Sequence, residues 1–137
     1  MTSPPPALEP APDWPDITLV LIEGLRPLLA GVRVSDQVPP RVETVLPVVV
    51  VQAAPGGGVS RIDGTAALDL SVFAGTPSAA WALARRVRTA VHSLPGTSAG
   101  WRIDASTTGW PVEVPYGNPA LCRVIGGCTI TVRATDA

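Results

Sequence analysis

The side chains that could carry out chemistry are few in this sequence. His92 is the only histidine, and it lies late in a predicted helix, four residues after Arg88 and off the apolar stripe of that helix. The C-terminal end of a helix favours a protonated imidazole, so a partly solvated surface residue accounts for His92 without catalysis. One histidine and the two distant cysteines Cys122 and Cys128 cannot complete a zinc site. We therefore predict no catalytic residue, no metal site and no cofactor.

Nucleotide chemistry is not indicated either. The sequence has no Walker A motif and no G-x-G-x-x-G opening a helix, and Gly56-Gly57-Gly58 is not followed by the Lys-Ser/Thr that binds phosphate. The carboxylates are scattered, and no local spacing forces two of them together. Two alternatives remain open: a small enzyme that brings His92, Asp63 and Asp104 together by folding, and a monomeric domain that binds a small molecule or peptide.

The two cysteines are predicted to stay unpaired. They share one side of a predicted strand from Leu121 to Ala134, and at roughly 3.3 Å per residue they lie about 20 Å apart. A disulfide requires Cα atoms within about 7 Å. We expect both to be small core residues, unless Gly126-Gly127 folds the strand back on itself.

Two helices must position these residues. In the first, Asp13 is predicted as N-cap and Pro15 lies in the first turn, and the regular helix should end near Arg26 because Pro27 follows. In the second, Thr76 is the N-cap and the proline after it takes the first helical position. This helix should end at Leu94-Pro95-Gly96, and its buried stripe is Ala80, Leu83, Ala84, Val87, Val91 and Leu94.

Alternating or continuous β-favouring residues predict strands at 32–35, 46–51, 65–73, 101–105 and 121–134. The run from Leu46 to Val51 is apolar throughout, which indicates burial on both faces, by helices and a second layer or by a partner chain. Ala54 to Gly58 is predicted to be the flexible, projecting tip of a long antiparallel hairpin. The fold class is α+β, a mostly antiparallel sheet with two helices packed on one face.

Composition limits the class of protein further. The 137 residues are 46% hydrophobic and carry ten arginines, no lysine and a net charge of −1, so stable binding to nucleic acid is not indicated. Residues 1–12 are predicted to be an extended Pro-rich arm, either disordered or lying on a neighbouring subunit, and residues 13–137 a single domain. No apolar run is long enough to span a bilayer and no secretory signal opens the chain, so we expect a soluble protein made in a cytoplasm.

One surface of the second helix could serve recognition. Trp81, Arg85, Arg88 and His92 recur at helical spacing beside the buried stripe. They form either a solvated cationic face or a subunit contact, since Trp and Arg are enriched among interface anchors.

The order and spacing of several segments carry a resemblance to a known family. These are Trp14-Pro15-Asp16 opening a helix that runs to Leu25-Arg26-Pro27-Leu28-Leu29, the strand Gly31-Val32-Arg33-Val34 with its exit Val38-Pro39, the tip Gly56-Gly57-Gly58-Val59-Ser60-Arg61, the strand Leu68-Asp69-Leu70-Ser71-Val72-Phe73-Ala74 before an Ala- and Arg-rich helix, and the final Thr129-Ile130-Thr131-Val132-Arg133. Over about residues 13 to 134 the chain resembles the tail terminator proteins of siphophages of actinobacteria.

The resemblance implies a non-enzymatic virion protein assembled in the host cytoplasm. Such a protein forms a ring, usually a hexamer, that caps the tail tube, docks to head-completion proteins of the neck and lets phage DNA pass through its lumen. The Pro-rich arm and Gly126-Gly127 depart from the family pattern, so another neck component, a head–tail connector or stopper, is the alternative. The candidate subunit contacts are Val48, Val50, Gly57, Arg61, Trp81, Arg85 and Arg88.

Overall fold

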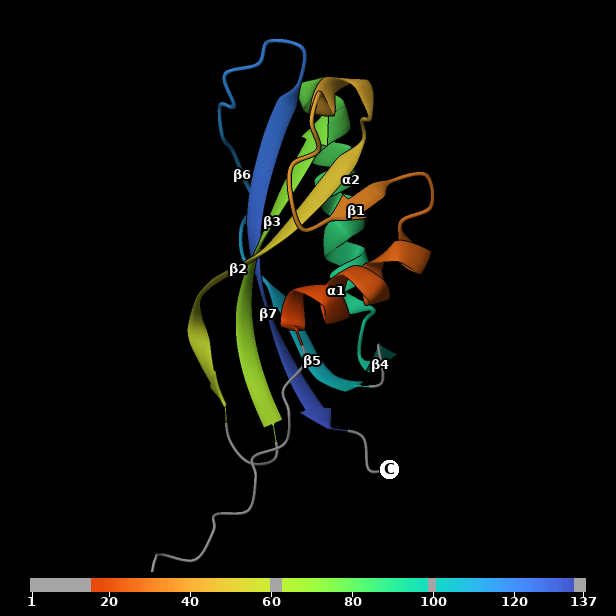
Figure 1. Ribbon diagram of the computed structural model, residues 1–137. Helices are drawn as coiled ribbons and strands as arrows, with labels where there is room; N and C mark the ends of the chain where they lie inside the picture. Colours follow the sequence, from red (N-terminus) through yellow and green to blue (C-terminus); the bar gives the residue numbers. More distant parts are fainter. Residues whose placement is uncertain (1–15, 60–62, 99–100, 135–137) are drawn as a thin grey trace, which may run out of the picture.

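A computed structural model describes residues 16–59, 63–98 and 101–134 of the chain. These residues form a seven-stranded sheet with two α-helices on one face, which confirms the α+β class (Figure 1). The elements in chain order are α1 Ile17–Leu25, η1 Arg26–Leu28, β1 Arg33–Ser35, η2 Val42–Thr44, β2 Val48–Val59, β3 Asp63–Ala74, α2 Pro77–His92, β4 Gly96–Ser98, β5 Trp101–Thr108, β6 Val112–Glu113 and β7 Cys122–Ala134.

The sheet is mostly antiparallel, as predicted. Its order is β1-β2-β3-β7-β5-β4, β6 also pairs with β7, and only β1 and β2 run parallel. β2 and β3 form the long hairpin, whose register places Val48 opposite Phe73 and Val59 opposite Gly64. β7 then pairs with β3 along its whole length, from Cys122 opposite Ala74 to Arg133 opposite Asp63.

The first helix begins later than predicted. Asp16 is its N-cap, because the Asp16 carboxylate accepts hydrogen bonds from the backbone N–H groups of Thr18 (3.0 Å) and Leu19 (3.4 Å). The assignment of Asp13 as N-cap is therefore wrong, and Asp13 itself lies outside the described residues. The end of the helix is confirmed: α1 stops at Leu25 and the chain continues as the short η1 turn, which contains the proline.

The second helix follows its prediction closely. The Thr76 hydroxyl accepts a hydrogen bond from the Ala79 N–H at 3.1 Å, and Pro77 is the first helical residue. α2 ends at His92. All members of the predicted stripe are buried, and they join the apolar side chains of α1 and the sheet in one core: Ala80, Leu83, Ala84, Val87, Val91 and Leu94.

Two strand boundaries differ from the prediction. β2 begins at Val48 rather than Leu46, because Pro47 has no N–H group to join the ladder. β2 then continues through the glycine-rich stretch to Val59, so the prediction of a loop from Ala54 to Gly58 is wrong. The register with β3 shifts between Ala54 and Gly57, which places Pro55 in a bulge where a missing donor costs little. The last described pair of the hairpin is Val59 with Gly64, and residues 60–62 lie outside the described part of the chain.

The segments around β5 contain more pairing than predicted. β5 extends to Thr108 rather than 105. The short strands β4 and β6 lie in stretches interpreted as connections, and each joins the sheet through two or three residue pairs. Strands of two or three residues are too short to show an alternation of apolar and polar residues, so the sequence does not predict them.

The prediction that the Leu46–Val51 run is covered on both faces is confirmed for its strand residues. Val49 and Val51 pack in the core beneath the helices. Val48 and Val50 point to the other face of the sheet, which we call the outer face, and a second apolar cluster covers them there. That cluster also contains Val42, Phe73 and Leu121, so the chain itself supplies both layers.

Candidate functional site

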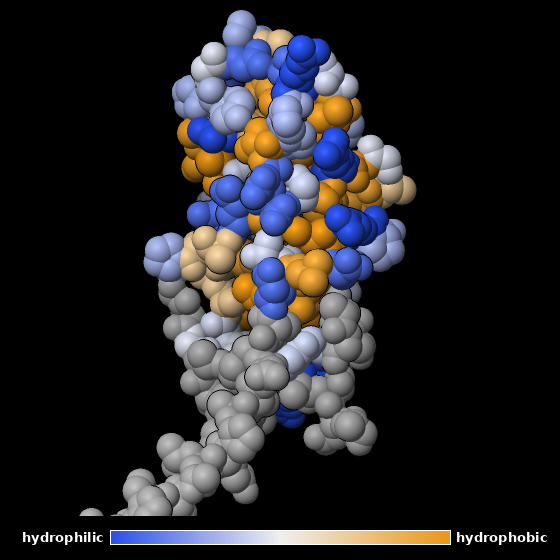
Figure 2. All heavy atoms as spheres, in the orientation of Figure 1, coloured by the Kyte–Doolittle hydropathy of each residue, from blue (hydrophilic) through white to orange (hydrophobic). Residues whose placement is uncertain are grey.

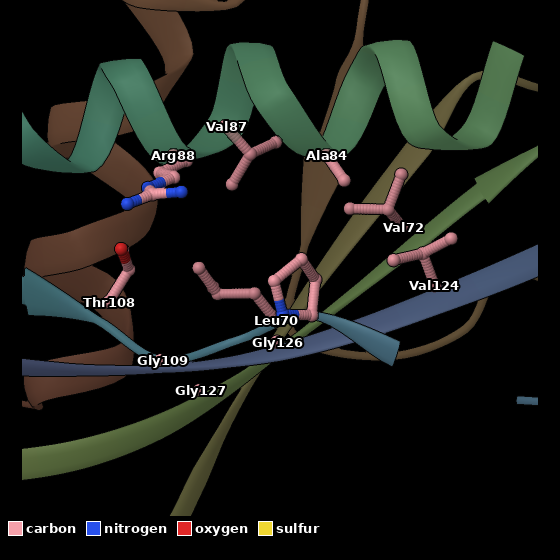
Figure 3. Close-up of a pocket in the computed structure, with 11 residues that line it drawn as sticks. Leu70, Val72, Ala84, Val87, Arg88, Thr108, Gly109, Val124, Gly126 and Gly127 are labelled. Atoms are coloured by element: carbon pink, nitrogen blue, oxygen red, sulfur yellow. The ribbon is translucent and has the colours of Figure 1, made fainter. Parts of the chain in front are cut away.

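The cavity between α2 and the sheet is too small for a substrate. It measures about 30 Å³, room for roughly one or two water molecules. Arg88 of α2 and Thr108 of β5 are the polar side chains on its wall, and the rest is apolar or glycine (Figure 3). The cavity is therefore a packing gap and not a binding site.

Two of the polar groups proposed for an enzyme, those of His92 and Asp104, are engaged separately, and the side chain of Asp63 lies outside the described part of the structure. The His92 Nε2 lies 2.9 Å from the Thr108 hydroxyl, whereas the Asp104 carboxylate pairs with the Nε atoms of Arg102 (3.0 Å) and Arg133 (3.3 Å). No hydrogen bond or ion pair among the described residues joins His92 to Asp104. Within residues 16–59, 63–98 and 101–134, no three His, Cys, Asp or Glu side chains are grouped to hold a metal ion.

Both cysteines are free, as predicted. Burial, and to a smaller degree the charge of Asp69, raises the pKa of the Cys128 thiol from 9.0 to about 12. A thiol held protonated in this way is not a nucleophile at neutral pH. Cys128 is therefore a core residue that faces the helices together with Val124 and Ile130.

Three of the ten arginines lie on α2. Arg85, Arg86 and Arg88 are exposed, and Trp81 is half-buried against the core. Arg86 donates from Nη2 to the Ala30 carbonyl at 3.3 Å. The side chains of Arg85 and Arg88 make no hydrogen bond or ion pair with the described residues.

A groove lies between η1 and α2. Its volume is about 520 Å³, and Leu28, which is 46% exposed, and Ala82 give it an apolar wall. Arg85 and Arg86 line it as cations, and no carboxylate belongs to its lining. We call this the α2 groove; its remaining lining residues are Thr89, Ala90 and Ser93.

The predicted subunit contacts fall in different places. Val48 and Val50 are buried by the chain itself, so no partner is needed to cover them. Gly57 lies in β2 opposite Ala66, just after the bulge. Arg61 and the arm of residues 1–12 lie outside the described residues. Trp81, Arg85 and Arg88 are close together on α2, as their helical spacing predicted.

The most exposed aromatic side chain among the described residues was not among the predicted contacts. It is Trp110, 86% exposed, in the segment 109–121 that we call the connector. Val112 and Tyr116, in the same segment, are 55% and 37% exposed. The signal was present in the sequence as apolar residues at every second position, Trp110, Val112, Val114 and Tyr116, but the flanking prolines and glycines indicated only a loop.

The first half of the connector, residues 109–114, is fixed to the sheet at two points. The Gly109 N–H donates to the Gly127 carbonyl, and the Val114 N–H donates to the Arg123 carbonyl, each at 2.9 Å. The Arg123 guanidinium lies 5.0 Å from the ring centroid of Tyr116, and Tyr116 meets Phe73 edge to face. The exposed row is therefore held by the protein in a defined position.

The described surface combines apolar and polar patches. Figure 2 shows apolar side chains exposed between polar ones on the face that carries α1 and β1. On the outer face, the hydroxyls of Thr65 and Thr131 lie 3.1 Å apart on neighbouring strands. Neither described helix is long and apolar enough to cross a membrane.

Comparison with known proteins agrees with this description. Residues 18–132 match the family described as "tail completion protein gp17". Among solved structures, a chain of the "virion of native gene transfer agent (GTA) particle" has a similar fold, with a TM-score of 0.53 and 18% sequence identity over 74% of this chain and 78% of that chain. No curated protein matches the sequence.

Proposed function

Because the chain belongs to the tail completion protein gp17 family and is thus a structural virion protein of the tail or neck, we propose that it is the tail terminator. In this role it forms a ring, a hexamer, that caps the tail tube and joins it to the neck and head-completion proteins. The ring assembles in the host cytoplasm.

One observation carries the proposal: the exposed apolar side chains lie on two separate surfaces. Leu19 and Leu28 belong to the α1–η1 side, and Trp110, Val112 and Tyr116 belong to the connector. A closed ring requires a heterologous contact, in which one surface of each subunit meets a different surface of the next. A domain with two such surfaces and without a substrate-sized internal cavity among its described residues is suited to this role.

The charge distribution supports passage of DNA through the ring. The chain has a net charge of −1. On β5 and β7, Asp104 neutralises part of the charge of Arg102 and Arg133. A lumen built from near-neutral subunits gains few phosphate contacts and therefore does not retain DNA.

Native mass spectrometry of the full chain and an image of the phage particle test the proposal together. We expect a six-subunit assembly, and a ring at the head-proximal end of the tail tube. A monomer at all concentrations, combined with absence from the particle, would contradict it. A ring higher in the neck, away from the tail tube, would instead identify a head–tail connector or stopper.

A further inference from the structure

Trp110 has the properties of an interface anchor. It is 86% exposed, yet its backbone is held between the hydrogen bond from Gly109 to Gly127 and Pro111, which packs over Gly126. A Cβ added to Gly126 would lie 3.5 Å from the Pro111 Cβ, so the connector rests directly on the sheet at this point. A large aromatic side chain on a fixed backbone loses little conformational entropy on binding.

An unpaired acid follows Trp110 at the same edge of the sheet. In β6, Val112 lies opposite Ile125 and Glu113 lies opposite Val124, which is buried beneath the helices. Directly opposed residues point to the same face, so Glu113 points to the helix side of the sheet. Its carboxylate is exposed and makes no ion pair with the described residues. The edge at β6 therefore presents a free negative charge on the helix side and, about 10 Å away along extended chain, an indole that belongs to the row on the opposite side, so a partner that contacts both must meet the sheet at this edge.

The α2 groove offers complementary chemistry on a different surface. Its wall of Leu28 and Ala82 is apolar, and it is large enough for an indole ring. Arg85 has a guanidinium free to stack on an aromatic ring or to pair with a carboxylate. The groove and the connector share no residue, which a head-to-tail contact between identical subunits requires.

We propose that Trp110 of one subunit inserts into the α2 groove of a second copy of this chain, where Glu113 pairs with Arg85. The inference deepens the proposed ring, since it names the contact that joins one subunit to the next. The indole packs on Leu28 and Ala82 and stacks against the groove's arginines. A second copy is the occupant because both halves of the contact occur on one chain. Trp110 and Glu113 lie at the β6 edge, and the α2 groove has an apolar wall and two arginines.

The first test removes the anchor. Trp110→Ala should raise the dissociation constant between subunits roughly thirtyfold or more, as measured by native mass spectrometry across a concentration series. Arg33→Ala is the matched control, because it truncates another long exposed side chain, on β1, outside the connector and the α2 groove, and it should assemble as the wild type does. Circular dichroism should show that both variants are folded.

The second test exchanges the charges. Glu113→Arg and Arg85→Glu should each weaken assembly, and the double variant should recover most of the loss. A photoreactive amino acid at position 110, in a mixture of isotopically light and heavy chains, should form cross-links between subunits to peptides that contain Leu28 or Ala82.

The outcomes separate the two proposals. If the wild type assembles and Trp110→Ala assembles equally well, the contact is wrong while the ring stands. Cross-links from position 110 only to another virion protein would also overturn the contact. If the wild type is monomeric at every concentration and absent from the particle, the ring proposal fails and this contact fails with it.

Discussion

At the scale of single residues, Cys128 shows how burial removes chemistry from a reactive side chain. The thiol faces the core beneath α1 and α2, and its desolvation raises the pKa to about 12. The alternation of the final strand predicted its buried position. The size of the pKa shift depends on α2 and β3, which pack around the thiol from distant parts of the sequence, so the strand pattern alone could not predict it.

Cys128 makes the protein less stable as the pH rises above 9. An unfolded chain releases the thiol proton near pH 9.0, whereas the native protein retains it up to about pH 12, so the unfolded state binds fewer protons in this window. The free energy of unfolding should therefore fall with a limiting slope of about 1.4 kcal/mol per pH unit. Urea unfolding from pH 8 to 10.5 measures it.

The control for this pH effect is Cys128→Ala, which should have a shallower alkaline slope than the wild type. The comparison is favourable because the chain has no lysine and a single tyrosine, so few other groups titrate in this range. Equal slopes in the two proteins would show that the Cys128 thiol ionises as easily in the native state as in the unfolded chain.

At the scale of elements, the sequence predicted the features that depend on neighbouring residues, such as helix caps and the buried sides of helices and strands. The N-cap at Thr76 and the buried stripe of α2 depend on residues that are near neighbours in the sequence. The same holds for the alternation of buried and exposed side chains along β3 and β7. The path of β2 through its glycines could not be predicted in the same way, because pairing with β3 stabilises the bulge at Pro55. The exposure of Trp110 could not be predicted for a similar reason: it depends on how the connector lies on β7.

The N-cap of α2 should contribute measurably to stability. Thr76→Ala removes the hydroxyl that accepts a hydrogen bond from the Ala79 N–H, and we expect a loss of about 1 kcal/mol in the free energy of unfolding. Thr76→Ser keeps the acceptor and should retain most of that stability. Urea denaturation of the three proteins tests the prediction, which fails if the alanine and serine variants unfold at the same concentration.

Packing between the connector and β7 should control the presentation of Trp110. Gly126→Ala adds a Cβ at ordinary contact distance from Pro111 and should change little. The larger Gly126→Val should push the connector away and weaken assembly several-fold while α2 and the main core stay folded. Hydrogen exchange at the Val114 amide, which donates to the Arg123 carbonyl, measures the displacement. Unchanged protection and assembly in the valine variant would contradict this coupling.

At the scale of the whole molecule, the chain covers its own apolar core without a partner. The helix side and the outer cluster are both covered by the chain, so Val48 and Val50 require no partner. Among the described residues, the large apolar side chains that remain exposed are few, and they lie on the α1–η1 side and on the connector. In the proposed ring, such a chain folds before it assembles, and assembly then adds stability by mass action.

This coupling predicts a melting temperature that depends on concentration. Thermal unfolding of the wild type should shift upward as the protein concentration rises through the range where rings form, because assembly favours the folded state. Trp110→Ala should melt at nearly the same temperature across that range and match the dilute wild type. A wild-type melting temperature that does not change while the oligomer dissociates would mean that assembly contributes no stability.

The length of β7 has a mechanical consequence. This strand is bonded to β3 along one side from Cys122 to Arg133 and, on its other side, to β6 near the connector and to β5 beyond it. A load applied at the connector and carried toward the far end of the strand acts along its axis, so β7 cannot slip unless both ladders break together. The protein should therefore be stiff under tension along β7. By contrast, β2 is paired with β1 only from Val48 to Val50, so a force that pulls the rest of β2 away from the sheet has to break only its ladder with β3.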